Sequence, residues 1–194
     1  MGTLGYLTIA LSIVWAIPEI RNTIRKRSSA PTAEKDRHSL LAVMAANYVS
    51  VALAVAIKLV PAAVGGIGGI TMRSSILGYF GCLVMILGMV IRWRAITMLK
   101  QQFTIDVAIV EGHKLVDTGL YGVIRHPAYL GGQVTLLGLG LALENWLSLL
   151  ILFILPLAAH LYRISVEEKV LVDHFGSSYS EYMKRTKRLI PGVF

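Results

Sequence analysis

The feature that most constrains this chain is a succession of apolar runs, each nearly as long as a membrane is thick. A helix needs about 20 apolar residues to cross the hydrocarbon core of a bilayer. The sequence predicts five spans, at residues 3–20, 40–60, 75–93, 127–143 and 146–162. The segments between them are too short for an independent soluble domain. We therefore expect one all-α integral membrane domain over residues 1–194.

The composition agrees with this class. Only 15% of the residues are charged and 55% are hydrophobic, whereas about one quarter of a soluble domain is charged. The net charge of +8 comes from short basic clusters without the interleaved aromatic residues of a nucleic-acid groove. Membrane lipids, and not nucleic acid, are the expected partners of these clusters. The single cysteine, Cys82, lies in an apolar run and can form no intramolecular disulfide.

The lysines and arginines also predict an orientation, because cytoplasmic loops are enriched in them. Residues 21–37, 94–126 and the helix or tail at 163–194 are rich in these side chains, whereas residues 61–74 carry only Arg73. We expect the N-terminus outside and the C-terminus in the cytoplasm, in the cell membrane or the endoplasmic reticulum. No cleavable signal peptide is expected, since the basic residues follow the first apolar run.

The last two apolar runs are predicted to form a tight antiparallel hairpin, with a kink at Pro156. Only Glu144 and Asn145 separate them. The hairpin returns the chain to the face where it started. It therefore brings two polar clusters together, at residues 113–131 and 160–168.

The first cluster surrounds the predicted start of a helix. Pro127 suits a first helical turn, where its missing N–H has no partner to lose. Arg125 and His126 directly precede that turn, where unpaired N–H groups and the helix dipole favour an anion. Tyr129 and Gly131 follow within it, and the glycine allows close approach of a ligand or a helix. The cluster predicts an anion-binding pocket.

The second cluster lies at the end of the last apolar run. His160, Arg163 and Glu167 are spaced i, i+3, i+7, so they share one helical face, and Arg163 can pair with Glu167. Glu168 points about 100° away from Glu167, so the two carboxylates are expected to meet different partners. Ionisable residues at membrane depth indicate function unless shown otherwise.

Taken singly, these residues also have structural explanations. Arg125 could be a membrane anchor, Arg163 and Glu167 a surface ion pair, and His160 an interhelical hydrogen-bonding residue. Tyr121 and Tyr129 could belong to an interfacial aromatic belt. The predicted hairpin favours a shared site, because it places both clusters on one face.

Residues 125–131 read Arg-His-Pro-Ala-Tyr-Leu-Gly. With this motif the chain resembles the isoprenylcysteine carboxyl methyltransferase family, which is related to membrane phospholipid methyltransferases. The resemblance covers residues 101–191, nearly half of the chain. Its further elements are Leu115 to Tyr121, Arg163, Glu167-Glu168, Leu171, Phe175-Gly176, Tyr179, Tyr182 and Ile190-Pro191. Leu120 departs from the family, which commonly has proline there, and the first two apolar runs carry no signature.

The resemblance implies a methyltransferase that uses S-adenosylmethionine, releases S-adenosylhomocysteine and needs no metal. The residues implied to bind the cofactor are His113, Leu115, Val116, Gly119, Tyr121, Arg125, His126, Pro127, Tyr129, Leu130 and Glu168. Arg163 and Glu167 would be the catalytic residues at the methyl-acceptor end. The implied acceptor is lipophilic, enters from the bilayer, and is best matched by the carboxylate of a prenylcysteine.

Methyl transfer from a sulfonium requires mainly orientation and exclusion of water. A carboxylate acceptor needs no base, and Arg163 could hold it while Glu167 fixes the arginine. An amine acceptor, as in phospholipid N-methylation, would need Glu167 as a base. An NADPH-dependent sterol-type reductase is a further alternative. A transporter is disfavoured, because the first four runs contain almost no ionisable residues. No obligate protein partner is evident.

Overall fold

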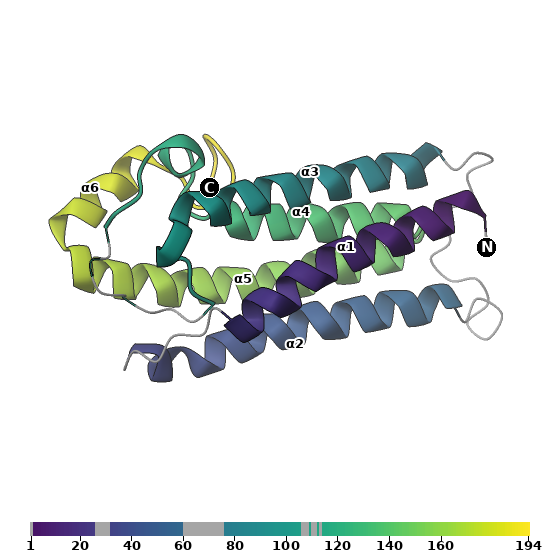
Figure 1. The fold of residues 1–194 in the computed structure, drawn as a ribbon, viewed down its shortest axis with the longest axis horizontal. Coiled ribbons are helices and arrows are strands. Elements are labelled where there is room, and N and C mark those ends of the chain that lie inside the picture. Colours follow the sequence, from purple (N-terminus) through teal and green to yellow (C-terminus); the bar gives the residue numbers. More distant parts are fainter. Residues whose placement is uncertain (1, 26–31, 60–75, 106–108, 110–111, 113) are drawn as a thin grey trace.

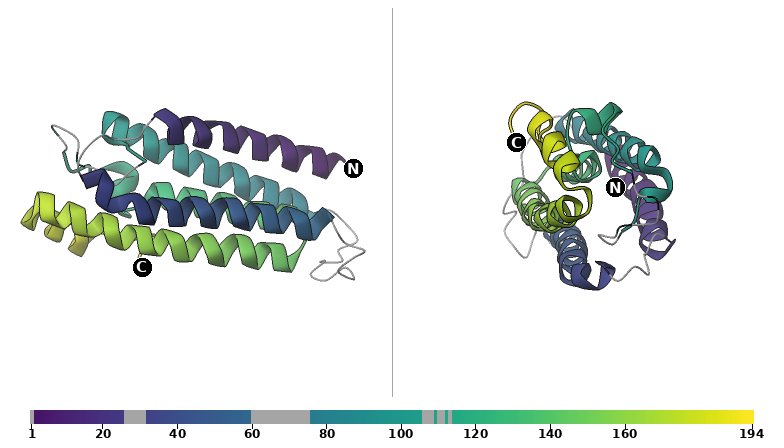
Figure 2. Two further views of the ribbon diagram at one scale, coloured as in Figure 1. Left: turned by 90° about the horizontal axis from the view of Figure 1, so that it is seen from below. Right: turned by 90° about the vertical axis from the view of Figure 1, so that its left-hand side faces the viewer.

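The computed structural model describes residues 2–25, 32–59, 76–105, 109, 112 and 114–194, and these residues are almost entirely helical. The α-helices among them are α1 (Thr3–Arg25), α2 (Thr32–Leu59), α3 (Ile76–Leu99), α4 (Pro127–Ala142), α5 (Trp146–Phe175) and α6 (Ser177–Arg185). Single 3₁₀ turns are formed by η1 (Lys100–Gln102) and η2 (Gly119–Gly122). Helices α1 to α5 run side by side as an elongated bundle, and α6 lies at one end of it (Figures 1 and 2). The predicted all-α class is confirmed.

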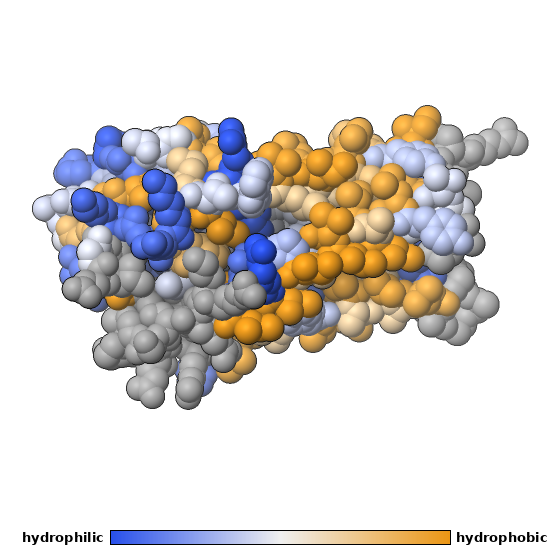
Figure 3. Space-filling model, in the orientation of Figure 1, coloured by the Kyte–Doolittle hydropathy of each residue, from blue (hydrophilic) through white to orange (hydrophobic). Residues whose placement is uncertain are grey.

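In the part of the chain that the structure describes, four helices are long and apolar enough to cross a membrane, at Thr3–Ile24, His38–Leu59, Ile76–Gln102 and Trp146–Phe175. Apolar side chains cover much of the bundle surface, and hydrophilic ones gather at the end that carries α6 (Figure 3). The chain is therefore an integral membrane protein. Helix α4 has 16 residues, which is short for a span, so a fifth crossing stays a prediction.

Several helices extend beyond the predicted spans. Helix α5 continues past residue 162 to Phe175, and α3 past residue 93 to Leu99. The prediction ended each span where charged residues begin, but a helix does not end at a membrane surface. Helix α5 ends only at Gly176, whose φ of 56° lies in the left-handed region that glycine adopts most easily.

Helices α3 and α4 pack with their backbones in close contact. A Cβ atom added to Gly81 or Gly88 of α3, or to Gly138 of α4, would lie closer than 3.0 Å to backbone atoms of the other helix. Small residues allow membrane helices to approach in this way. This close packing fixes the start of α4 against α3.

The predicted hairpin between α4 and α5 is present. Asn145 caps α5, its side chain accepting a hydrogen bond from the Ser148 backbone N–H (2.9 Å). The Ser148 hydroxyl in turn donates to the Ala54 carbonyl of α2 (3.1 Å). The start of α4 and the end of α5 consequently lie at the same, hydrophilic end of the bundle (Figure 1).

Candidate active site

A cavity lies at the hydrophilic end of the bundle. Its empty volume is about 1160 Å³ when the space open to solvent is included. Leu40 and Val43 of α2 contribute apolar wall. The polar and charged lining residues are Arg92, Gln102, Thr104, Lys114, Tyr121, Arg125, His126, Tyr129, Arg163, Glu167, Tyr179 and Tyr182.

Most of the predicted site residues meet at this cavity. Those that line it are Leu115, Val116, Tyr121, Arg125, His126, Tyr129, Arg163 and Glu167. Among the described residues, Gly119, Pro127, Leu130 and Glu168 do not line it, and His113 lies outside the described part of the chain. Pro127 occupies the first position of α4, as predicted, and His126 precedes it.

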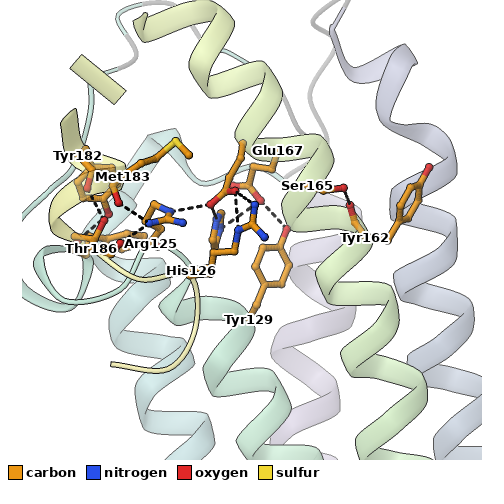
Figure 4. A network of polar contacts seen from close by, with 12 residues as sticks. Arg125, His126, Tyr129, Tyr162, Ser165, Glu167, Tyr182, Met183 and Thr186 are labelled. Atoms are coloured by element: carbon orange, nitrogen blue, oxygen red, sulfur yellow. Dashed lines mark hydrogen bonds and ion pairs between the residues drawn. The ribbon is translucent and has the colours of Figure 1, made fainter. Parts of the chain in front are cut away.

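Tyr129 connects Arg163 to Glu167. The Arg163 Nε–H donates to the Tyr129 hydroxyl oxygen (2.9 Å), and the Tyr129 O–H donates to Glu167 Oε2 (2.9 Å). Figure 4 shows the Tyr129 ring reaching from α4 toward the Glu167 carboxylate on α5. The two residues predicted to pair along one helix are thus joined through a tyrosine of the neighbouring helix.

The Arg163 guanidinium is held from further sides. Its Nη1 donates to the Ser39 hydroxyl of α2 (3.0 Å), and its Nη2 donates to the Ile105 carbonyl. Arg163 is 3% exposed, so these contacts fix a buried cation. Ser39 is a site residue that sequence reasoning missed, since one serine at the start of an apolar run gives no signal.

Glu168 pairs with arginines, whereas Glu167 pairs with Tyr129, as their positions on the helix predicted. One partner is shared, because His126 Nδ1 also lies 3.9 Å from Glu167 Oε2. Glu168 Oε1 accepts from Arg125 Nε (2.7 Å), and its Oε2 accepts from Arg188 Nε (2.9 Å). His126 Nε2 lies 3.3 Å from Oε1. The carboxylate is only 6% exposed. It therefore ties α5 both to the residues that precede α4 and to the C-terminal tail.

The tail pairs with the segment before α4. The Arg125 N–H donates to the Lys187 carbonyl (2.7 Å), and the His126 N–H donates to the Arg188 carbonyl (3.1 Å). Tyr182 of α6 donates its hydroxyl to the Tyr121 carbonyl (2.7 Å). Burial raises the pKa of Tyr182 to about 12, so this donor keeps its proton at neutral pH. Helix α6 and the tail thus support three residues of the cavity wall.

A second, half-buried ion pair borders the cavity. Arg92 of α3 binds the Glu19 carboxylate of α1 through two hydrogen bonds. Its Nε donates to Oε1, and its Nη2 donates to Oε2 (2.6 Å). Its Nη1 donates to the Ala128 carbonyl in the first turn of α4 (3.0 Å). The sequence analysis gave this pair no role. The sequence did contain a signal for this pair, namely an acidic and a basic residue in two separate apolar runs. Burying an ionisable residue in a membrane costs free energy, so such a residue needs a partner.

Comparisons with known proteins show which proteins this chain resembles. The family model described as phospholipid methyltransferase matches residues 76–178, which hold much of the cavity wall. The chain is 36% identical over 107 residues to the protein-S-isoprenylcysteine O-methyltransferase of Schizosaccharomyces pombe, covering 54% of this chain and 45% of that protein. Over 115 residues it is 36% identical to the protein-S-isoprenylcysteine O-methyltransferase of Saccharomyces cerevisiae, covering 58% and 48%. The chain spans about half the length of these relatives.

A solved structure shares the fold. It is that of a eukaryotic intramembrane Ras methyltransferase, an isoprenylcysteine carboxyl methyltransferase, and superimposes with a TM-score of 0.61 at 26% identity. The match covers 75% of this chain and 52% of the other. These similarities confirm the resemblance seen in residues 101–191.

Proposed function

The chain belongs to the phospholipid methyltransferase family, and on that premise we propose that it methylates the carboxylate of a prenylcysteine-like acceptor, with S-adenosylmethionine as methyl donor. The observation that carries this proposal is the chain of hydrogen bonds from Arg163 through Tyr129 to Glu167. It borders the same cavity as the residues implied to bind the cofactor.

The part of the cavity lined by Leu115, Val116, Arg125 and His126, here called the cofactor half, suits a nucleoside with an anionic end. Leu115 and Val116 provide an apolar wall for a base, and Arg125 provides positive charge beside the N-terminus of α4, with His126 next to it. By resemblance we assign His113, Gly119, Pro127, Leu130 and Glu168 to the same half. Glu168 would act there by fixing Arg125 and His126, which it contacts directly.

The acceptor half is organised around Arg163. When bound, the cofactor supplies a methyl group already activated on a sulfonium, so the protein needs to orient a carboxylate oxygen toward it and exclude water. A buried guanidinium binds a carboxylate through charge-assisted hydrogen bonds. Tyr129 and Ser39 fix its orientation, and Glu167 acts on it through Tyr129.

Phospholipid N-methylation is the second candidate. The description of the matched family model favours it. Glu167, which lines the cavity, would then accept the proton that an amine loses when it is methylated.

We also propose that α4 crosses the membrane as a fifth span. It carries the chain from the cavity end to the far end, where α5 begins (Figure 1). The basic segments lie at the cavity end, which the positive-inside rule assigns to the cytoplasm. An apolar acceptor tail would then approach from the bilayer beside Leu40 and Val43, while the cofactor arrives from the cytosol.

The test measures radiolabelled methyl transfer from S-adenosylmethionine to farnesylcysteine and to phosphatidylethanolamine in separate reactions. We expect transfer to farnesylcysteine, its loss in Arg163→Lys, and nearly unchanged binding of S-adenosylhomocysteine by that variant in calorimetry. Arg185→Lys is the control, since Arg185 is exposed and paired only with Asp117 among the described residues. Transfer to the aminolipid alone would favour the second candidate. No binding of S-adenosylhomocysteine by the native protein would refute both.

A further inference from the structure

Polar residues of α4 and α5 form a ladder that extends beyond the cavity toward the middle of the bundle. His126 is the N-cap of α4, and Tyr129 and Gln133, spaced i, i+4 within the helix, share one face. Their partners on α5 follow in reverse order, because the two helices are antiparallel: Glu168 with His126, Arg163 with Tyr129, and His160 with Gln133. The first two rungs belong to the site described above, whereas the third has no role in it.

The hydrogen-bond directions of the third rung follow from its partners. Gln133 Nε2 donates to the Phe153 carbonyl of α5 (2.9 Å). Gln133 Oε1 therefore faces His160 Nδ1 at 3.2 Å. An amide oxygen only accepts, so Nδ1 carries the hydrogen. Gln133 and His160 are 6% and 4% exposed, and the rung consequently holds the imidazole in one buried orientation.

The imidazole of His160 packs against the ring of Tyr129. The ring centroids are 5.3 Å apart and the planes are tilted by 43°. Tyr129 lines the cavity, whereas His160 and Gln133 are not among the described lining residues. The third rung therefore contacts Tyr129 without itself contributing to the described cavity wall.

Small shifts of Tyr129 are important because its hydroxyl both accepts from Arg163 and donates to Glu167. Both bonds depend on where the end of the ring lies. A misplacement of about 1 Å at a reacting centre can lower a rate about 100-fold. Residues that lock the rotamer of such a group control its geometry from outside the site.

We propose that Gln133 and His160 are positioning residues for methyl transfer. Gln133 orients the His160 ring, the His160 ring fixes the Tyr129 ring, and Tyr129 sets the geometry of Arg163 and Glu167. The inference rests on the proposed function, because its main readout is turnover.

The test is a double-mutant cycle between His160→Asn and Tyr129→Phe. Asparagine keeps an N–H for Gln133 but has no ring, so we expect kcat to fall roughly 10- to 100-fold while the Kd for S-adenosylhomocysteine stays within about twofold of that of the native protein. In the Tyr129→Phe background there is no hydroxyl to position, so the same change should lower kcat less than about twofold further. His160→Phe restores a ring but loses the hydrogen bond to Gln133, so it should recover only part of the loss.

His174→Asn is the matched control. It is the same substitution in the same helix, at an exposed position outside the cavity lining, and should leave kcat unchanged. If His160→Asn lowers kcat by the same factor in both backgrounds, the pair is only structural and the proposal is overturned. An inactive native protein would instead refute the proposed function.

A measurement that does not depend on turnover distinguishes failure of the positioning role from failure of the proposed function. With 3-fluorotyrosine incorporated at position 129, the ¹⁹F spectrum of the native protein should show one narrow resonance for Tyr129, which should broaden or split in His160→Asn and stay narrow in His174→Asn. An unchanged resonance in His160→Asn would overturn the positioning role whether or not an acceptor has been found.

Discussion

Replacing Glu168 with glutamine should destabilise the protein by about 3 kcal/mol. The carboxylate is 6% exposed and pairs with Arg125, whose side chain is 8% exposed. Removing one partner of a buried ion pair costs about 3 to 5 kcal/mol. The contact with Arg188 adds little to this, since that side chain is 38% exposed and solvent screens it. We therefore expect a value near the lower end of the range.

Thermal unfolding of the detergent-solubilised protein, followed by circular dichroism, measures this effect. At about 2 to 4 °C per kcal/mol for a chain of this size, the Tm should fall by roughly 6 to 12 °C. The affinity for S-adenosylhomocysteine should fall as well, because Arg125 and His126 line the cavity. Glu181→Gln is the matched control: its ion pair with Lys184 is exposed and contributes less than about 1 kcal/mol. Equal Tm changes in the two variants would refute the reasoning.

Three further perturbations probe other contacts, each measured by the change in Tm. Gly138→Val should cost about 3 kcal/mol or more, because its Cβ would overlap the Met85 backbone and separate α3 from α4. Glu19→Gln should cost about 2 kcal/mol, because it leaves Arg92 with an uncharged partner beside the cavity. Tyr182→Phe should cost about 1 kcal/mol and weaken binding of S-adenosylhomocysteine about fivefold, because it removes the hydrogen bond to the Tyr121 carbonyl.

Each of these variants has a control in the same chain. A side chain at Gly2 would meet no atom within 4 Å, so Gly2→Val should leave the Tm unchanged. Tyr6 is 65% exposed, so Tyr6→Phe should change neither the Tm nor cofactor affinity. Glu181→Gln serves again for Glu19→Gln. A variant that shifts the Tm no more than its control contradicts the contact assigned to it.

The sequence predicts those features that local spacing determines. Apolar runs predict the spans, two intervening residues predict the α4–α5 hairpin, and a spacing of three and four residues predicts that Arg163 and Glu167 share a face. The position of Pro127 predicts the start of α4. Each of these features depends on residues within a few turns of one another.

Contacts between distant runs could not be predicted in the same way. Glu19 and Arg92 pair because α1 and α3 are neighbours, and no local spacing relates them. Ser39 reaches Arg163 across the bundle for the same reason. The bridging role of Tyr129 depends on the axial register between α4 and α5, which is set by packing along their whole lengths. The motif at residues 125–131 therefore identified Tyr129 as a site residue, but it did not predict that Tyr129 contacts Arg163 and Glu167.

The unbroken course of α5 also has a consequence for the lipid environment. At 1.5 Å per residue, about 26 Å of helix separate Trp146 from Arg163, close to the hydrocarbon thickness of about 30 Å in a typical bilayer. The helix thus has an aromatic residue at one end of its apolar stretch and the arginine near the other. A thicker or thinner bilayer would shift the membrane surface along the helix relative to the buried Arg163, at a cost of a fraction of a kcal/mol per Å of mismatch. Acyl-chain length should thus tune the level at which a lipid-borne acceptor meets a water-borne donor.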